Sequence, residues 1–61
     1  MTAEDTARLE KLCDDASACL FRIRSTFRRG DYGVAAGHAG QLTDASDAIE
    51  ETLITEADKP I

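Results

Sequence analysis

The stretch that most constrains the fold is Arg28-Arg29-Gly30-Asp31-Tyr32, near the middle of the chain. Gly30 can adopt the left-handed conformation that ends many helices, and Arg28 and Arg29 place positive charge at a helix's negative end. Asp31 can begin the next helix, because its carboxylate can accept hydrogen bonds from the free N–H groups of a first turn. A helix stop followed at once by a helix start predicts two antiparallel helices joined by a short turn.

The residues before this turn predict a helix over about 3–29. Thr2 is a candidate N-cap, and Glu4 and Asp5 place negative charge in the first turn. Apolar residues then recur at steps of three and four, the spacing of a helix with one apolar face. This row consists of Leu9, Leu12/Cys13, Ala16, Cys19/Leu20, Ile23 and Phe27.

A second helix is predicted over about 32–57, with a weaker apolar row. The row consists of Ala35, His38/Ala39, Leu42, Ala45, Ile49 and Thr52/Leu53. Its first half contains Gly33, Gly37 and Gly40, and each glycine costs about 0.8–1 kcal/mol relative to Ala inside a helix. The Gly- and Ala-rich stretch indicates either that another backbone approaches closely or that the helix is interrupted.

An interruption would fall near Gly40, with Thr43 or Asp44 capping a separate helix over about 44–57. We favour one continuous helix, because Leu42 and the residues after it keep the phase of the row. The tail over 57–61 ends the helix, since Pro60 cannot continue it.

The composition favours association between chains. The hydrophobic fraction is 43%, but Ala supplies ten of these residues. A chain this short buries only about 60% of its unfolded surface, and two helices cannot enclose a core between them. We therefore expect an all-α fold in which residues 1–61 form a single domain. This domain is an antiparallel two-helix hairpin that dimerises into a four-helix bundle.

The charges are segregated along the predicted hairpin. Residues 1–15 carry a net charge of −3, residues 20–32 carry +3, and residues 44–61 carry −5. Folding at the turn gives a rod with a positive turn end and a negative open end. Complementary charge favours an antiparallel homodimer, in which each turn lies beside the partner's termini. The alternative is that these charges are solvated and select no orientation.

The cysteines and the histidine predict no cofactor and no metal site. Cys13 and Cys19 lie about 9 Å apart along one helix, too far for an internal disulfide or for adjacent ligands of one metal ion. Both flank the apolar row and are expected to be small buried side chains. His38 is the only histidine, and we expect it to be partly buried and hydrogen-bonded. A metal site shared with Cys19 would need both subunits of a dimer.

Candidate partner-binding residues lie off the apolar rows. Phe21 lies roughly opposite Ile23 on the first helix, and Ile54 is similarly off the second row. An exposed Phe beside arginines is typical of a contact surface for another molecule. The candidate residues are Phe21, Arg24, Arg28, Arg29 and Ile54. The alternative is that Phe21 packs on Gly37 and Gly40, which the hairpin places opposite it.

Charge and targeting signals narrow the functional class. The net charge of −5 disfavours a nucleic-acid binder that neutralises phosphates. Residues 1–20 lack the pattern of a signal peptide, and no stretch reaches the roughly 20 apolar residues of a membrane span. We therefore expect a cytoplasmic protein with no membrane partner.

We expect a small non-enzymatic protein-interaction module that acts as a homodimer and binds a protein partner. It could be an adaptor, an inhibitor or a regulator, encoded by a phage or mobile element. The alternative is a nucleic-acid-binding regulator that uses an arginine patch near the turn, comprising Arg22, Arg24, Arg28 and Arg29. Catalysis is not supported, because the serines and the histidine form no nucleophile motif.

Two resemblances are local or architectural. The string Gly30-Asp31-Tyr32 followed by Ala35 resembles the turn and second-helix start of a tetratricopeptide repeat. In length and layout the whole chain is similar to small plasmid-encoded RNA-binding helical-hairpin dimers, although its acidic charge departs from what RNA binding favours. Neither resemblance carries a functional residue across to this chain.

Overall fold

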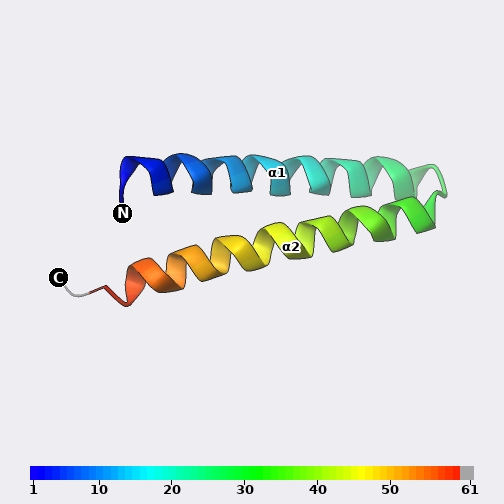
Figure 1. Cartoon of the computed structure of the whole chain (residues 1–61). Coiled ribbons are helices and arrows are strands. Elements are labelled where there is room, and N and C mark those ends of the chain that lie inside the picture. Colours follow the sequence, from blue (N-terminus) through cyan, green and yellow to red (C-terminus); the bar gives the residue numbers. More distant parts are fainter. Residues whose placement is uncertain (60–61) are drawn as a thin grey trace.

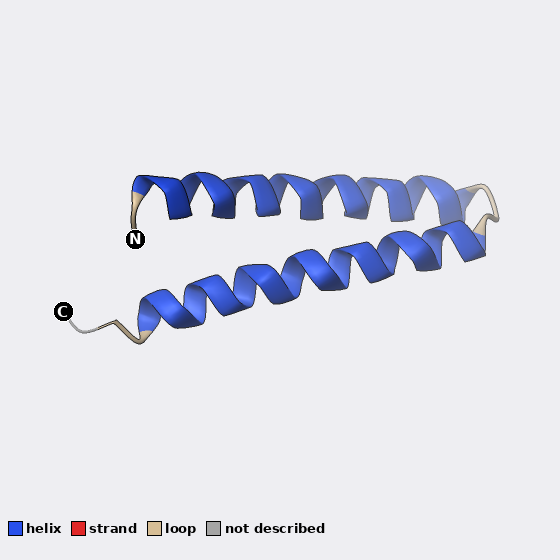
Figure 2. Ribbon diagram, viewed as in Figure 1, coloured by secondary structure: helices blue, strands red, loops and turns tan. Residues whose placement is uncertain are grey.

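The fold is a helical hairpin, seen in a computed structural model that describes residues 1–59. Helix α1 (Ala3–Arg28) and helix α2 (Tyr32–Ala57) run antiparallel and pack against each other (Figure 1). The remainder of this described part consists of the turn and the two short ends (Figure 2). The predicted hairpin is confirmed, with the first helix ending one residue earlier than expected.

Helix α1 begins as the sequence predicts. The Thr2 hydroxyl accepts a hydrogen bond from the Asp5 backbone N–H at 3.1 Å, which satisfies one of the free donors of the first turn. Glu4 and Asp5 then place negative charge at the positive end of the helix.

The turn between the helices is a Schellman motif centred on Gly30, which has a φ of 84°. The Gly30 N–H donates to the Phe27 carbonyl at 3.0 Å, and the Asp31 N–H donates to the Thr26 carbonyl at 2.9 Å. These two bonds satisfy carbonyls that the end of α1 would otherwise leave free. Glycine is required at this point because an L side chain is strained at such a φ.

The expected carboxylate cap at Asp31 is wrong. The Asp31 side chain makes no capping hydrogen bond to α2. Its Oδ2 lies 3.4 Å from Nε of Arg29 instead, so the carboxylate is directed back across the turn. Asp31 still begins α2 through its backbone, because its carbonyl accepts from the Ala35 N–H at 3.0 Å.

Helix α2 is continuous through its glycines, as the phase of the apolar row predicts, and the alternative break near Gly40 does not occur. It ends at Ala57, where the Asp58 N–H donates to the Ile54 carbonyl at 3.0 Å. Pro60, which was expected to stop the helix, lies outside the described residues.

The seam between the helices is built from residues at steps of three and four on both helices. These inward positions are at least partly buried: Leu9, Leu12, Ala16, Cys19, Ile23 and Thr26 from α1, and Ala35, His38, Leu42, Ala45, Ile49 and Thr52 from α2. Only three of them are buried, namely Cys19, Thr26 and Ala35, and the others are partly exposed. None of the large side chains among residues 1–59 is completely enclosed.

Thr26 occupies the inward position that was expected for Phe27. The short turn joins the helices beside this position (Figure 1), and the seam there buries the small side chains of Thr26 and Ala35. The Thr26 hydroxyl donates to the Arg22 carbonyl at 2.7 Å, so its burial leaves no polar group unsatisfied. The assignment of Phe27 to the seam is therefore wrong, and that side chain is 47% exposed.

The hairpin is elongated and one helix thick. Its Cα extents are 49 × 17 × 11 Å and its radius of gyration is 14.3 Å, whereas a compact domain of this length would have a radius of about 10.5 Å. Both broad sides of the seam are therefore open. Across residues 1–59, neither helix has an apolar stretch long enough to cross a bilayer.

Substitution by Ala should have opposite effects on stability at Gly30, in the turn, and at Gly40, inside α2. Gly30→Ala should lower the free energy of unfolding by about 1–2 kcal/mol, because Ala is strained at positive φ. Gly40→Ala should raise it by about 0.8–1 kcal/mol, because a Cβ there has nothing within 4 Å. Urea denaturation followed by circular dichroism measures both values. Equal effects of the two substitutions would contradict the assigned turn.

Candidate protein-interaction surface

One side of the seam is polar. Two open grooves of about 480 and 450 Å³ lie along it. Several residues that line them directly precede inward positions, namely Arg8, Asp15 and Arg22 on α1, and Gln41 and Ala48 on α2. Charged and amide groups therefore flank the seam on this side, and water can solvate it.

The opposite side of the seam is apolar. Because the helices are antiparallel, residues that directly follow certain inward positions lie together there, away from the polar grooves. These are Cys13, Leu20 and Phe27 on α1, at seven-residue intervals, and Leu53 on α2. We call this group the Leu20 side. Within this group, the side chain of Leu20 is 54% exposed, that of Phe27 is 47% exposed and that of Leu53 is 45% exposed.

The Leu20 side was not recognised as a surface from the sequence. Cys13, Leu20 and Phe27 were placed in or beside the apolar row, and Cys13 was expected to be buried. The structure corrects this, since Cys13 is exposed and Cys19 alone is buried. The signal that could have identified the surface was the repetition of apolar residues at exact heptad spacing beside the main row.

The outward faces of the two helices carry Phe21 and Ile54, which are 71% and 53% exposed. Nothing lies within 4 Å of a Cβ built at Gly37 or Gly40, so Phe21 does not pack on these glycines. Ile54 lies on the other helix at the level of Ala7, about 21 Å from Phe21 along the axis. The candidate residues Phe21 and Ile54 therefore do not form one patch.

The four arginines near the turn are exposed but are not together. Arg24 and Arg28 lie next to Phe21 on the outer side of α1, since steps of three, four and seven bring residues to one helix face. Arg22 borders a polar groove on the other side, and Arg29 pairs with Asp31 at the turn. The arginine patch expected near the turn is thus divided between two sides of the helix.

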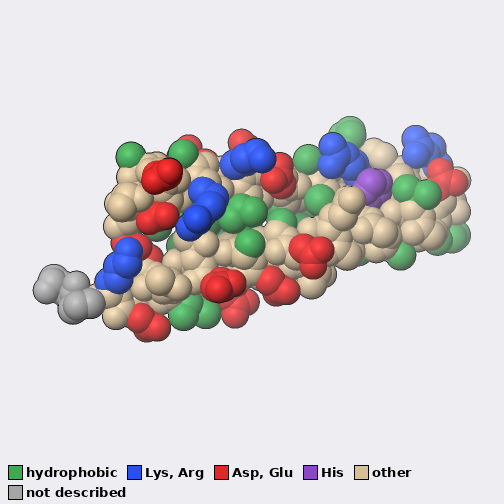
Figure 3. Space-filling model, in the orientation of Figure 1, with side chains coloured by type: hydrophobic (Ala, Val, Ile, Leu, Met, Phe, Trp, Pro, Cys, Tyr) green, Lys and Arg blue, Asp and Glu red, His purple; other side chains and the backbone are tan. Residues whose placement is uncertain are grey.

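The charge segregation expected along the rod is retained in three dimensions. Figure 3 shows one broad face of the hairpin, with basic side chains along α1 and acidic ones over α2 and toward the free ends. The residues before and after the turn carry a net +3 over 20–32, while the segments at the open end carry −3 over 1–15 and −5 over 44–61.

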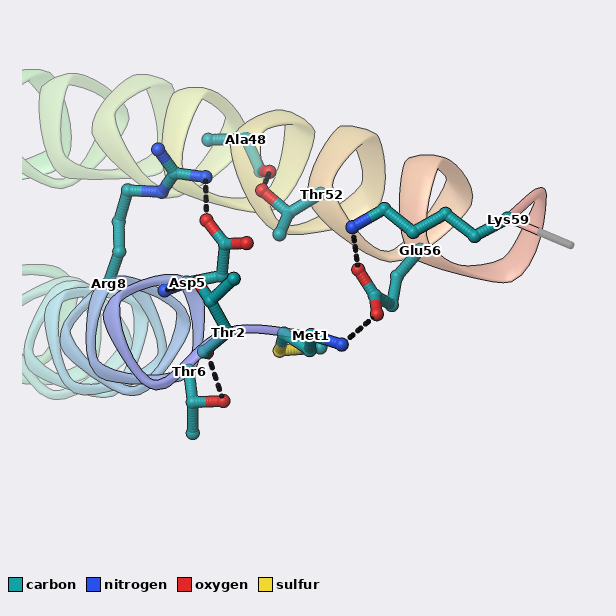
Figure 4. A network of polar contacts seen from close by, with 9 residues as sticks. All are labelled: Met1, Thr2, Asp5, Thr6, Arg8, Ala48, Thr52, Glu56 and Lys59. Carbon is teal, nitrogen blue, oxygen red and sulfur yellow. Dashed lines mark hydrogen bonds and ion pairs between the residues drawn. The ribbon is translucent and has the colours of Figure 1, made fainter. Parts of the chain in front are cut away.

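The open end of the hairpin is held by Glu56. Its carboxylate accepts a hydrogen bond from Nζ of Lys59 at 2.8 Å and also pairs with the Met1 ammonium group (Figure 4). The hydrogen bond from Lys59 lowers the pKa of Glu56, and the same bond raises the pKa of Lys59. This contact connects α2 to the start of α1, and both pairs are solvated.

His38 and the cysteines offer little for chemistry. His38 is half-buried, as expected, and its Nδ1 lies 3.1 Å from Oε1 of Gln41. Both thiols are free. In the described part of the chain, no three His, Cys, Asp or Glu side chains are placed to hold a metal ion.

Comparisons of the chain with models of known families, with curated proteins and with solved structures gave no significant match. The functional argument therefore depends on the surface of the hairpin itself.

Proposed function

We propose that this chain is a small, non-enzymatic protein-interaction module that acts as a cytoplasmic homodimer, with two hairpins forming a four-helix bundle. The observation that carries the proposal is the Leu20 side. A row of apolar side chains at seven-residue intervals lies open beside a seam that encloses no large side chain. Apolar strips of this kind mark interaction sites on soluble proteins.

The exposed area supports association. The hairpin has an accessible surface of 4639 Å², whereas a compact monomer of its mass would expose about 3,900 Å². A specific interface removes roughly 800 Å² from each partner. A second hairpin covering the Leu20 side would therefore reduce the exposed area per chain to that of an ordinary folded protein.

A bundle formed in this way leaves the outward faces free. Phe21, with Arg28 beside it, then serves as the contact for a second protein. An exposed aromatic ring with a neighbouring arginine has the composition of an interface hot spot. The dimer presents this contact twice, which suits an adaptor, an inhibitor or a regulator that binds a symmetric or repeated target.

The homodimer predicts different effects for two equally exposed residues. Leu20 is 54% exposed and Ile54 is 53% exposed, so Leu20→Glu and Ile54→Glu cost the isolated hairpin similar amounts. Sedimentation at micromolar concentration should give a dimer for the natural chain and for Ile54→Glu, but a monomer for Leu20→Glu. A folded monomer for the natural chain would refute the homodimer.

The protein partner is tested by capture from cells. Phe21→Ala should reduce recovery of the bound protein by tenfold or more, since hot-spot truncations cost about 2 kcal/mol. Ile54→Ala, on the outward face of the other helix, should leave recovery unchanged. Equal recovery by the Phe21→Ala variant and the natural chain would remove Phe21 as the contact.

A separate binding assay tests the nucleic-acid alternative. Salt-sensitive binding to generic RNA or DNA duplexes that Arg28→Glu abolishes would favour a nucleic-acid partner instead.

A further inference from the structure

A second row of side chains runs along α1 beside the Leu20 side. Glu10, Ser17 and Arg24 repeat at seven-residue intervals, each located three residues before Cys13, Leu20 and Phe27 in turn. Glu10 and Arg24 are exposed. Among residues 1–59, neither side chain takes part in a hydrogen bond or an ion pair. The row therefore has an acidic end toward the termini and a basic end toward the turn.

We infer that the Leu20 side is covered by a second copy of this chain in one specific arrangement, with α1 antiparallel to the partner's α1. In this arrangement Cys13 faces the partner's Leu20, and Glu10 pairs with the partner's Arg24. The inference rests on the proposed homodimer and adds its orientation and register.

Two-fold symmetry leaves two ways to place one hairpin face to face on another. In the antiparallel arrangement, α1 lies on the partner's α1 and α2 on the partner's α2. In the parallel arrangement, the two turns lie at the same end and α1 lies on the partner's α2. The rows on the Leu20 side distinguish these arrangements.

In the antiparallel arrangement, one register pairs Cys13 with Leu20 and Glu10 with Arg24, while Phe27 lies opposite the partner's Thr6. Under two-fold symmetry, a contact of residue i with residue j is repeated as j with i, so the sum of the two numbers is constant along α1. Cys13 opposite Leu20 gives a sum of 33, and Glu10 opposite Arg24 gives 34, a difference of one residue or about 1.5 Å. Ser17 then lies next to its own copy at the symmetry axis.

The same register fits the rest of the hairpin. A residue of α1 lies level with the residue of α2 whose number brings the sum of the two to about 61. Leu12 and Ala48, which line one polar groove, and Asp15 and Ala45, which line the other, show this register. The register on α2 therefore places Leu53 opposite the partner's Ala36, and the small residue Ser46 opposite the partner's Thr43. The helices overlap over nearly their full length, and each positive turn lies beside the partner's negative termini.

The parallel arrangement opposes like charges. At equal level, Glu10 lies opposite the partner's Glu50, and Arg24 lies opposite the partner's Ala36 with no acidic neighbour. Like charges in contact suppress an arrangement more reliably than opposite charges add affinity. The charge pattern therefore favours the antiparallel dimer.

A charge exchange tests the register. At low salt, Glu10→Arg and Arg24→Glu should each weaken the dimer about tenfold, because each creates two like-charge contacts across the interface. The double variant E10R/R24E should return the dissociation constant to within about twofold of the natural value. Sedimentation equilibrium over a range of concentrations measures all four constants.

The control is the double variant D14R/R28E, which makes the same exchange on the outward face of α1. It and its single variants should leave the dissociation constant unchanged. Rescue in this pair as well would show that general charge, and not a contact, is responsible, and would overturn the inference.

The remaining outcomes separate the register from the homodimer. If Glu10→Arg strengthens the dimer, the arrangement is parallel. If the double variant E10R/R24E loses as much dimer affinity as the two single variants together, Glu10 does not pair with Arg24. Both results overturn the inference while the homodimer remains. A natural chain that is monomeric at all concentrations would overturn the proposed function itself.

Discussion

A hairpin of two helices is only one helix thick, and the other features of this structure follow from that constraint. A single seam can exclude water from one row of side chains on each helix. Here the seam buries Cys19, Thr26 and Ala35, and it leaves its larger apolar residues partly exposed. Hydrophobic burial inside one chain is therefore small, although the helices themselves are long.

The two sides of the seam differ in how they expose its partly buried residues. On the polar side, Arg8, Asp15 and Arg22 flank the grooves, and water can remain there at little cost. On the other side, Leu20 and Phe27 continue the apolar surface beyond the seam. Val34, which directly precedes Ala35 on the polar side, is also 54% exposed, but Leu20, Phe27 and Leu53 make the other side the more apolar one. This asymmetry favours a face-to-face pair of hairpins on that side.

The sequence was sufficient for the features that local chemistry determines. Gly30 and Thr2 mark helix ends through backbone geometry, and the phase of the apolar row established that α2 runs unbroken past Gly40. Predictions that depended on competition between neighbours were less accurate. The carboxylate of Asp31 was assigned to a cap, but it pairs with the guanidinium of Arg29. Thr26, and not Phe27, is the buried residue at the end of α1.

The candidate site could be predicted only in part. The exposure of Phe21 followed from its position opposite the seam, whereas its separation from Ile54 depends on the register of the hairpin. Composition identified arginines near the turn but could not show that Arg22 and Arg24 lie on different sides of α1. The heptad spacing of Cys13, Leu20 and Phe27 was a sequence signal for an apolar row at the edge of the seam. The structure was needed to show that Cys13 is exposed and that this row lies away from the polar grooves.

The central claim is that folding and association are one process, and the concentration dependence of thermal unfolding tests it most directly. If a second hairpin supplies the missing apolar layer, the midpoint should rise by about 5–10 °C for a hundredfold increase in protein concentration. A midpoint independent of concentration, with cooperative unfolding throughout, would show that the single hairpin is stable alone and would contradict the account.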